Sequence, residues 1–304
     1  MVTQQSEGRI VLSAPVRGAL YMVISAFFFA ITAGLIRYAT REVHPFEAAF
    51  LRSISGLLFM LPLVIGGGLA GIRMQQPGLH LFRGILSASG TLMWFSALAL
   101  LAVGEAVALN FTAPLFATIM APFVLHEVVR ARRWTACALG FIGVLIMLRP
   151  GVEAISPGAL LSIGSAMTIA CNMMIIRIVS QQDNTRTVVL AFSFYLSLFT
   201  LLPAIIVWQT PSWEVLGALI LCGIFSTLAH LLLTRAMSIA EMSAIAPLDF
   251  VRLLFAAGIG FIWFAEVPDK WTAVGAIVIA GSAVYIARRE AIAARHTPAV
   301  GAAP

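Results

Sequence analysis

Residues 227–252 read TLAHLLLTRAMSIAEMSAIAPLDFVR, and this stretch decides the fold because it is the second copy of an earlier one. The letters TLMW at positions 91–94 recur 136 residues later as TLAH at positions 227–230. Glu105 recurs at the same offset as Glu241. Weak internal symmetry of this kind is typical of membrane proteins assembled from structural repeats. The sequence therefore predicts a chain built from two copies of one unit.

The composition predicts the class. The chain has 304 residues, of which 61% are hydrophobic and 11% are charged. A soluble domain carries about a quarter charged residues, so this composition cannot cover a globule in water. The apolar runs are continuous and do not alternate as in an outer-membrane barrel. We therefore expect an all-α polytopic membrane protein. The net charge of +6 comes from arginines near the ends of these runs, which favours a role in topology over binding of nucleic acid.

Ten apolar runs are long enough to cross a bilayer, which takes about 20 residues. The predicted spans are 17–39, 46–66, 80–101, 105–125, 133–149, 158–178, 187–208, 213–234, 242–264 and 271–288. Residues 1–16 and 290–304 are expected to be cytosolic tails. The first tail lacks the apolar core of a cleavable signal peptide.

The basic residues predict the orientation. If the amino terminus is cytosolic and the spans alternate, thirteen of the 19 basic residues fall on the cytosolic side or its span ends. The four on the other side are Arg37, Arg41, Arg149 and Lys270, and the two within spans are Arg52 and Arg252. Positive charge is enriched in cytosolic loops. We therefore expect a multi-pass protein of the bacterial inner membrane with both termini in the cytosol.

Further matches extend the repeat along the chain. Gly18-Ala19-Leu20 matches Gly158-Ala159-Leu160, Arg37 matches Arg177, Pro62 matches Pro203, and Glu127 matches Glu266. These matches divide the chain into two halves of five helices, residues 17–150 and 157–289. Because five is odd, the second half must enter the membrane upside down. Inverted repeats are a transporter architecture, with the substrate site near the midplane between the halves. Shared composition alone does not explain matches at Arg, Glu and Pro in the same order.

With ten spans in two inverted halves, the chain resembles the drug/metabolite transporter superfamily, and within it the EamA-type branch. The resemblance runs from about Gly18 to Glu290. Its most specific parts are Ala113-Pro114, His126-Glu127 and Trp134 with Gly140 and Gly143, then Ala246-Pro247-Leu248-Asp249, Glu266 and Trp271 with Gly275 and Gly281. The resemblance implies one fold with diverse cargo: amino acids, riboflavin, S-adenosylmethionine, nucleotide precursors or drugs.

The quoted stretch supplies the first candidates for a substrate cavity. Asp249 and Arg252 are three residues apart, so on a helix they share a face and can pair. They either line the path of a zwitterionic substrate or form a structural ion pair. His230 stands where the first copy has Trp94, so these two large side chains are candidate walls of a central cavity. A packed, hydrogen-bonded histidine is the alternative.

Three further polar residues complete the candidate cavity. Arg52 lies within a span, and because it follows Glu47 by about one turn, a local ion pair between them is the favoured interpretation. Thr32 and Asn172 match across the repeat and could donate hydrogen bonds either to a substrate or to a neighbouring helix. The three cysteines lie in apolar runs and are interpreted as packing residues.

These observations favour a secondary transporter that moves amino acids, aromatic or neutral ones among them, or similar small metabolites by alternating access, with export as the expected direction. The alternative of the same class is import of a vitamin or nucleoside-like metabolite, of the riboflavin or S-adenosylmethionine type, and a drug exporter is a further alternative. The sequence has no phosphate-binding loop, catalytic triad or metal cluster. We therefore expect no enzyme activity, no cofactor, no nucleic-acid partner, contact with lipid, and a monomer.

Overall fold

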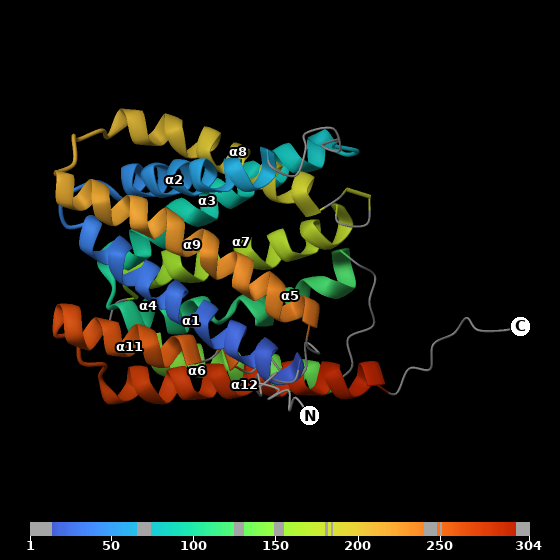
Figure 1. The fold of residues 1–304 in the computed structure, drawn as a ribbon. Coiled ribbons are helices and arrows are strands. Elements are labelled where there is room, and N and C mark those ends of the chain that lie inside the picture. Colours follow the sequence, from blue (N-terminus) through green and yellow to red (C-terminus); the bar gives the residue numbers. More distant parts are fainter. Residues whose placement is uncertain are drawn as a thin grey trace, which may run out of the picture.

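The structure is a computed structural model that describes residues 14–65, 74–124, 131–148, 155–179, 182–183, 185–239, 248–249 and 251–295. Within these residues the chain forms helices and no strand. The helices are α1 (Ala14–Ala39), α2 (Pro45–Ile65), α3 (Pro77–Leu100), α4 (Val103–Asn110), α5 (Ala113–Val124), α6 (Ala131–Leu148), α7 (Pro157–Val179), α8 (Thr185–Ile206), α9 (Trp213–Ile239), α11 (Val251–Phe264) and α12 (Lys270–Arg295). They lie roughly side by side in stacked layers (Figure 1).

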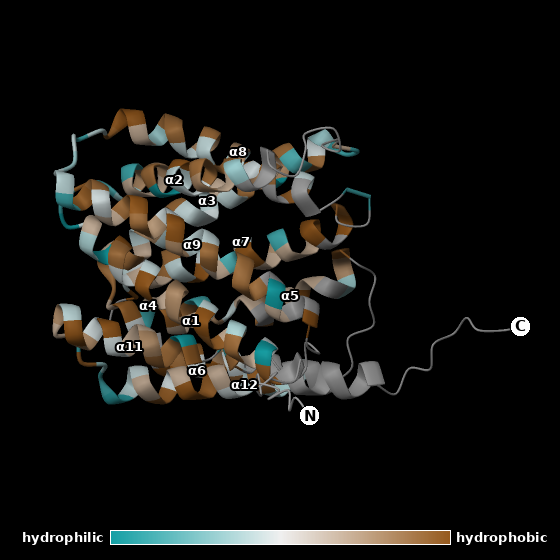
Figure 2. Cartoon of the chain, viewed as in Figure 1, coloured by the Kyte–Doolittle hydropathy of each residue, from teal (hydrophilic) through white to brown (hydrophobic). Residues whose placement is uncertain are grey.

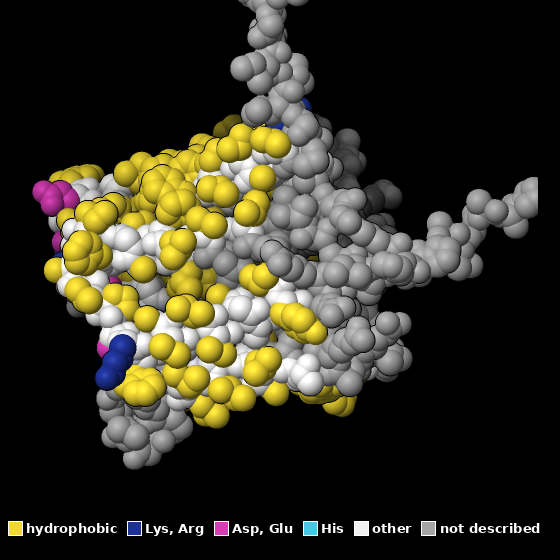
Figure 3. All heavy atoms as spheres, turned by 90° about the horizontal axis from the view of Figure 1, so that it is seen from below, with side chains coloured by type: hydrophobic (Ala, Val, Ile, Leu, Met, Phe, Trp, Pro, Cys, Tyr) yellow, Lys and Arg dark blue, Asp and Glu magenta, His cyan; other side chains and the backbone are white. Residues whose placement is uncertain are grey.

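The composition of the helices explains why they pack as a bundle in a bilayer. Four stretches are long and apolar enough to cross a membrane: Val16–Ala39, Val103–Met120, Pro157–Ile176 and Trp213–Leu233. Three other described helices have shorter apolar stretches. Apolar residues predominate along the helices, and polar residues are more frequent at their ends (Figure 2). On the part of the face in Figure 3 that is not grey, hydrophobic side chains are widespread, and the few charged side chains lie toward the edge. A surface of this kind suits lipid and does not suit water.

The two ends of the bundle are defined by contacts between helix termini. At one end, which we name the Arg37 end, Arg37 of α1 donates to the carbonyl oxygen of Leu98 in the last turn of α3, at 3.1 Å. A Cβ atom placed on Gly158, at the start of α7, would lie 2.8 Å from Cγ of Leu101. Helices α1 and α3 therefore finish where α7 begins, so α1 and α7 run in opposite directions.

The opposite end, which we name the Asp183 end, is defined in the same way. Asp183, between α7 and α8, accepts a hydrogen bond from the backbone N–H of Gln75, just before α3, at 2.9 Å. Ser212, just before α9, instead donates its N–H to Glu42 at the Arg37 end. Helix α3 thus begins at the Asp183 end and α9 begins at the Arg37 end, so these two helices also run in opposite directions.

The contacts between the first set of helices (α1–α6) and the second set (α7–α12) are reciprocal. Helix α1 packs against α9 and α11, and correspondingly α7 packs against α3, α4 and α5. Helix α2 packs against α8 and α9, and correspondingly α8 packs against α2 and α3. Helices α6 and α12 pack against each other. Each set therefore completes the core of the other.

The largest apolar cluster lies mainly toward the Arg37 end. It includes Ile36 of α1, Phe95 and Leu98 of α3, and Leu109 of α4, all of them buried. Helices α1 and α11 approach closely here, since a Cβ atom on Gly34 would lie 2.6 Å from Cγ2 of Ile259. Small residues allow this close approach between helices in a membrane.

The structure differs from the sequence-based boundaries in three places. Within the span expected at 242–264, Leu248 and Asp249 lie in a 3-10 segment and helix α11 begins at Val251. The span expected at 105–125 is divided into α4 and α5 by a turn at Phe111-Thr112. A proline at position 114 has no N–H to donate to the carbonyl of Asn110, so one continuous helix could not form through this point. At the other end of the chain, α12 continues to Arg295, into the residues expected to be a tail. Glu241 and Pro247, both in the stretch quoted above, lie outside the described residues.

Candidate functional site

Asp249 and Arg252 lie where α11 begins, and both are partly buried. Oδ2 of Asp249 lies 3.2 Å from Nη2 of Arg252, so the predicted pairing of these residues is confirmed. The Arg252 guanidinium also lies over two aromatic rings, 4.6 Å from the centroid of Phe111 and 5.5 Å from that of Phe29. A guanidinium is attracted to the face of an aromatic ring. The two phenylalanines and Asp249 together fix the position of the Arg252 side chain.

His230 lies on α9 beside Phe29, one of the two phenylalanines that contact Arg252. Its ring packs edge-on against Phe29, with 4.9 Å between the ring centroids. Nδ1 lies 2.8 Å from the carbonyl oxygen of Ser226. A carbonyl can only accept, so Nδ1 carries the proton and Nε2 of the neutral ring is the acceptor. His230 is an exposed residue although α9 packs against α1 and α2. That it lines a substrate cavity stays a prediction.

Arg52 reaches the same part of the bundle from α2. One of its Nη atoms donates to the hydroxyl of Ser226, whose carbonyl holds His230. The expected ion pair with Glu47 is wrong, because no such pair joins these two described residues. Five residues turn a helix by about 140° beyond one full turn, so the two side chains point to different faces. Glu47 instead accepts the backbone N–H of Gln209 at 2.9 Å.

We name the set of Arg52, Ser226, His230, Phe29, Arg252, Asp249 and Phe111 the central cluster. It joins α1, α2, α9, α11 and the turn between α4 and α5. Sequence reasoning found its ionisable members but missed Ser226, Phe29 and Phe111. Ser226 could have been noticed because it precedes His230 by four residues, the spacing at which a helical side chain reaches a backbone carbonyl.

The other three predicted cavity residues lie apart from the contacts of the central cluster. Asn172 of α7 accepts a hydrogen bond from the Ser87 hydroxyl of α3 at 3.0 Å and donates to the Thr168 carbonyl at 3.0 Å. Thr32 is buried and donates to the Phe28 carbonyl at 2.8 Å. Both contacts fit the alternative of bonding within and between helices. Trp94 is partly buried and packs against the main apolar cluster.

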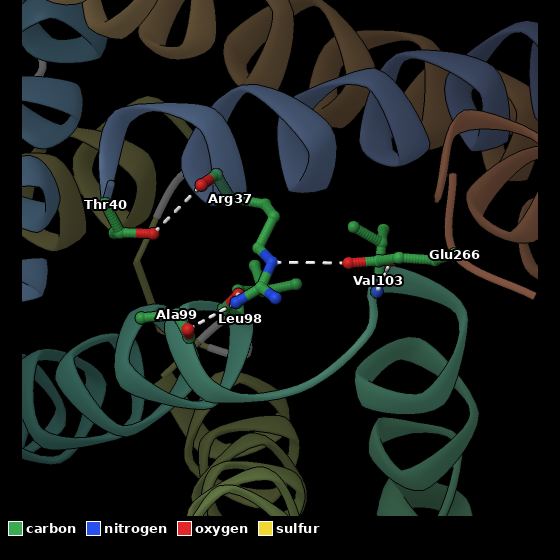
Figure 4. Close-up of polar contacts among 6 residues, drawn as sticks. All are labelled: Arg37, Thr40, Leu98, Ala99, Val103 and Glu266. Atoms are coloured by element: carbon green, nitrogen blue, oxygen red, sulfur yellow. Dashed lines mark hydrogen bonds and ion pairs between the residues drawn. The ribbon is translucent and has the colours of Figure 1, made fainter. Parts of the chain in front are cut away.

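A second polar cluster, which the sequence did not predict, lies at the Arg37 end (Figure 4). Nε of Arg37 lies 3.4 Å from Oε1 of Glu266, and one of its Nη atoms donates to the carbonyls of Leu98 and Ala99. Oε2 of Glu266 accepts the backbone N–H of Val103, the first residue of α4, at 2.8 Å. The cation therefore caps the carboxyl end of α3 and the carboxylate caps the amino end of α4, as the helix dipole favours.

Two further contacts are alike in the two halves of the chain, because in each a carboxylate that follows one helix accepts the N–H of a residue that precedes another. Glu42, after α1, accepts the N–H of Ser212 before α9 at 2.5 Å. Asp183, after α7, accepts the N–H of Gln75 before α3 at 2.9 Å, and its other oxygen lies 2.6 Å from Nε2 of the buried His80. Burial alone would raise the pKa of the Asp183 carboxyl, but hydrogen bonds from His80 and from the Gln75 N–H, with the charge of His80, outweigh it and hold that pKa below its usual value.

A bundle of apolar helices in two reciprocally packed sets, with ionisable and aromatic side chains between them, is typical of membrane transporters. The EamA-like transporter family matches the chain twice, over residues 16–149 and again over residues 156–288. The chain belongs to this family and is a multi-pass membrane transporter of the drug/metabolite type. The family expected from the sequence is therefore confirmed.

Curated relatives from bacteria resemble the chain over most of its length. The S-adenosylmethionine uptake transporter of Rickettsia prowazekii is 28% identical over 291 residues, which cover 94% of this chain and 98% of the relative. The riboflavin transporter of Vibrio cholerae is 30% identical over 281 residues, covering 91% and 94%. The pseudopaline exporter of Pseudomonas aeruginosa is 27% identical over 277 residues, covering 89% and 96%.

A solved structure confirms the fold by comparison. It has a TM-score of 0.62 and 19% sequence identity, and the match covers 90% of this chain and 98% of that one. At this low sequence identity the match shows a shared fold and says nothing about the substrate.

Proposed function

We propose that the chain is a secondary transporter of the bacterial inner membrane, with ten spans in two inverted five-helix halves and both termini in the cytosol. Four observations support it: the two family matches, the opposite directions of α1 and α7, the reciprocal packing of the two sets, and the matched contacts of Glu42 and Asp183. In this orientation the Asp183 end is cytosolic and the Arg37 end faces the periplasm. The substrate passes through the central cluster by alternating access.

The substrate of this proposal is a small metabolite with a flat heteroaromatic ring, and the transporter takes it up. The observation that carries the choice is the arrangement of Phe29, Phe111 and His230 around the Arg252 guanidinium. Aromatic faces and a planar guanidinium both stack on flat rings. Two of the relatives named above are transporters of riboflavin and of S-adenosylmethionine, both of which contain such a ring.

Charge distinguishes between these two types of cargo. The described charged groups of the central cluster are Arg52, Arg252 and Asp249, so the cluster carries more positive than negative charge when His230 is neutral. A sulfonium compound such as S-adenosylmethionine would meet repulsion from the two guanidiniums. A neutral ring system with several carbonyl acceptors, of the riboflavin type, would accept hydrogen bonds from them. We therefore favour a neutral or anionic heteroaromatic substrate.

Export of an amino acid is the second candidate. The Asp249–Arg252 pair, 3.2 Å apart, is complementary to the ammonium and carboxylate of a zwitterion. One of the relatives is named an exporter, so the fold is compatible with that direction.

Counterflow in proteoliposomes tests the proposal. Purified protein is reconstituted with an excess of one unlabelled compound inside, and entry of the same labelled compound is followed for riboflavin, S-adenosylmethionine and neutral amino acids. We expect counterflow of riboflavin, its loss in Arg252→Gln, and its retention in the matched control Arg235→Gln, which removes an exposed arginine of α9. Counterflow of S-adenosylmethionine alone would refute the charge argument, and counterflow of amino acids alone would establish the second candidate.

A further inference from the structure

The Arg37–Glu266 contact joins the two family repeats where four helix ends meet. Arg37, Leu98, Ala99 and Val103 all belong to the first repeat, and Glu266 belongs to the second. Figure 4 shows the two side chains pointing toward each other between α1, the end of α3 and the start of α4. Removing Glu266 from this place would leave the α4 N–H and the Arg37 guanidinium without their carboxylate. The contact thus holds part of the second repeat against the first.

The backbone beside Glu266 is strained. Ala265 has a φ of 55°, the left-handed region that residues with a Cβ atom rarely adopt. Its N–H donates to the carbonyl of Phe261 at 3.0 Å and ends α11, and Glu266 follows directly. Strain of this kind is concentrated at functional sites and switch regions. Here it turns the chain so that the Glu266 carboxylate faces Arg37.

The Arg37–Glu266 contact lies apart from the central cluster, at the Arg37 end of the bundle. Arg252 is in the first turn of α11 and Glu266 follows its last turn, so about 20 Å of helix separates them. Between them the close contact of Gly34 with Ile259 joins α1 to α11. Helices α1 and α11 are therefore packed closely at a level between the central cluster and the Arg37–Glu266 pair.

The exposure of the pair suits a contact that breaks and reforms. The side chains of Arg37 and Glu266 are 22% and 16% exposed, so water reaches other atoms of the pair although Nε of Arg37 itself is buried. The His80–Asp183 pair at the other end is 1% exposed on both sides, and breaking it would strand two buried polar groups.

We propose that the Arg37–Glu266 pair is a gating contact, which holds the Arg37 end closed and must break before the central cluster can be reached from that end. This inference rests on the proposed alternating-access function, but it makes no assumption about the substrate. In the state described here the gate is closed.

Side-specific labelling of a single cysteine tests the gate without a substrate. In a variant with Cys137, Cys171 and Cys222 replaced, His230→Cys reports access to the central cluster from either side of sealed vesicles. A separate Thr210→Cys variant identifies the side on which the Arg37 end lies. We expect Glu266→Gln to raise the labelling of His230→Cys from that side by about tenfold, the change that a modest shift of the closed population gives. The control Glu214→Gln removes an exposed carboxylate at the same end and should leave labelling unchanged.

A disulfide between α4 and α11 makes the test independent of how well Glu266→Gln folds. A Cβ atom on Gly104 would lie 3.6 Å from Cβ of Ala257, which is within the range of disulfide-bonded cysteines. We expect the oxidised Gly104→Cys/Ala257→Cys variant to suppress labelling of His230→Cys from the Arg37 end, and reduction to restore it. Peptide-resolved mass spectrometry separates the three cysteines.

Two results would overturn the proposal. One is unchanged access in a Glu266→Gln protein that melts normally, and the other is access from the Arg37 end that persists with the disulfide fully formed. Failure of riboflavin counterflow would leave the labelling result standing, so the gate and the substrate are tested separately.

Discussion

Breaking the Asp249–Arg252 pair should destabilise the protein, and removing both partners should restore much of the loss. The atoms Oδ2 and Nη2 are 3.2 Å apart. Unit charges at this distance attract by about 1.3 kcal/mol at the dielectric constant of water and by about 5 kcal/mol at an effective value of 20. The two side chains are 27% and 23% exposed, so solvent screens part of this attraction. We expect Asp249→Asn to cost about 2 kcal/mol, between these two limits.

The remaining contacts of Arg252 set the size of the recovery. In Asp249→Asn the guanidinium still lies over Phe111 and Phe29, and such cation–π contacts stabilise by about 1 kcal/mol each. The double variant Asp249→Asn/Arg252→Gln loses these contacts but no longer contains an unpaired cation. Removing both partners of such a pair is often close to neutral. We therefore expect the double variant to be more stable than Asp249→Asn by about 1 kcal/mol.

Thermal unfolding of the purified proteins in detergent measures this cycle, with Arg235→Gln as the control for removal of an arginine. Counterflow by the same proteins then separates stability from transport. A stable double variant that does not transport would show that the pair contacts the substrate path. Equal stability of the wild type and Asp249→Asn would refute the reasoning, because it would mean that the pair contributes nothing to folding.

Three further predictions concern single residues. Ser226→Ala removes the acceptor of Arg52 and should lower riboflavin counterflow at least about tenfold with little change in melting temperature. The control Thr227→Val removes the neighbouring hydroxyl and should leave counterflow unchanged. Equal losses of counterflow in both variants would place Ser226 outside the site. Ala265→Gly should raise stability by about 1 kcal/mol, because glycine adopts a positive φ without the strain of a Cβ atom, and a lower melting temperature would contradict this assignment. Asp183→Asn should lower the melting temperature at pH 7, and this difference from the wild type should shrink as the pH falls below about 4. The reason is that a carboxyl with a lowered pKa stabilises the fold only while it is ionised. A difference in melting temperature that does not depend on pH would refute this explanation.

The sequence predicted the features that depend on local pattern. Apolar runs and their separators predicted the positions of the helices, and the spacing of Asp249 and Arg252 predicted their contact, although Asp249 lies just before α11 and not on the same helix. The same kind of argument failed for Glu47 and Arg52. Their spacing was taken as about one turn, although five residues place them on different faces.

Contacts between distant parts of the chain could not be predicted in this way. Arg52 contacts Ser226 and Arg37 contacts Glu266, pairs that are 174 and 229 residues apart. Nothing in the periodicity of one helix specifies its partner on another. The internal repeat did single out Arg37 and Glu266, because each of them has a matching residue in the other half, but it did not predict that they contact each other.

The reciprocal packing has a consequence for how the protein is made. Among the described helices, those of the second set pack mainly on helices of the first, and α1, α2 and α6 find their main partners in the second set. The first helices to leave the ribosome therefore enter the bilayer before most of their partners exist. They must wait as separate spans, surrounded by lipid, until the second set is inserted. The bundle can assemble only at the end of synthesis, as if two subunits of a dimer had been joined into one chain.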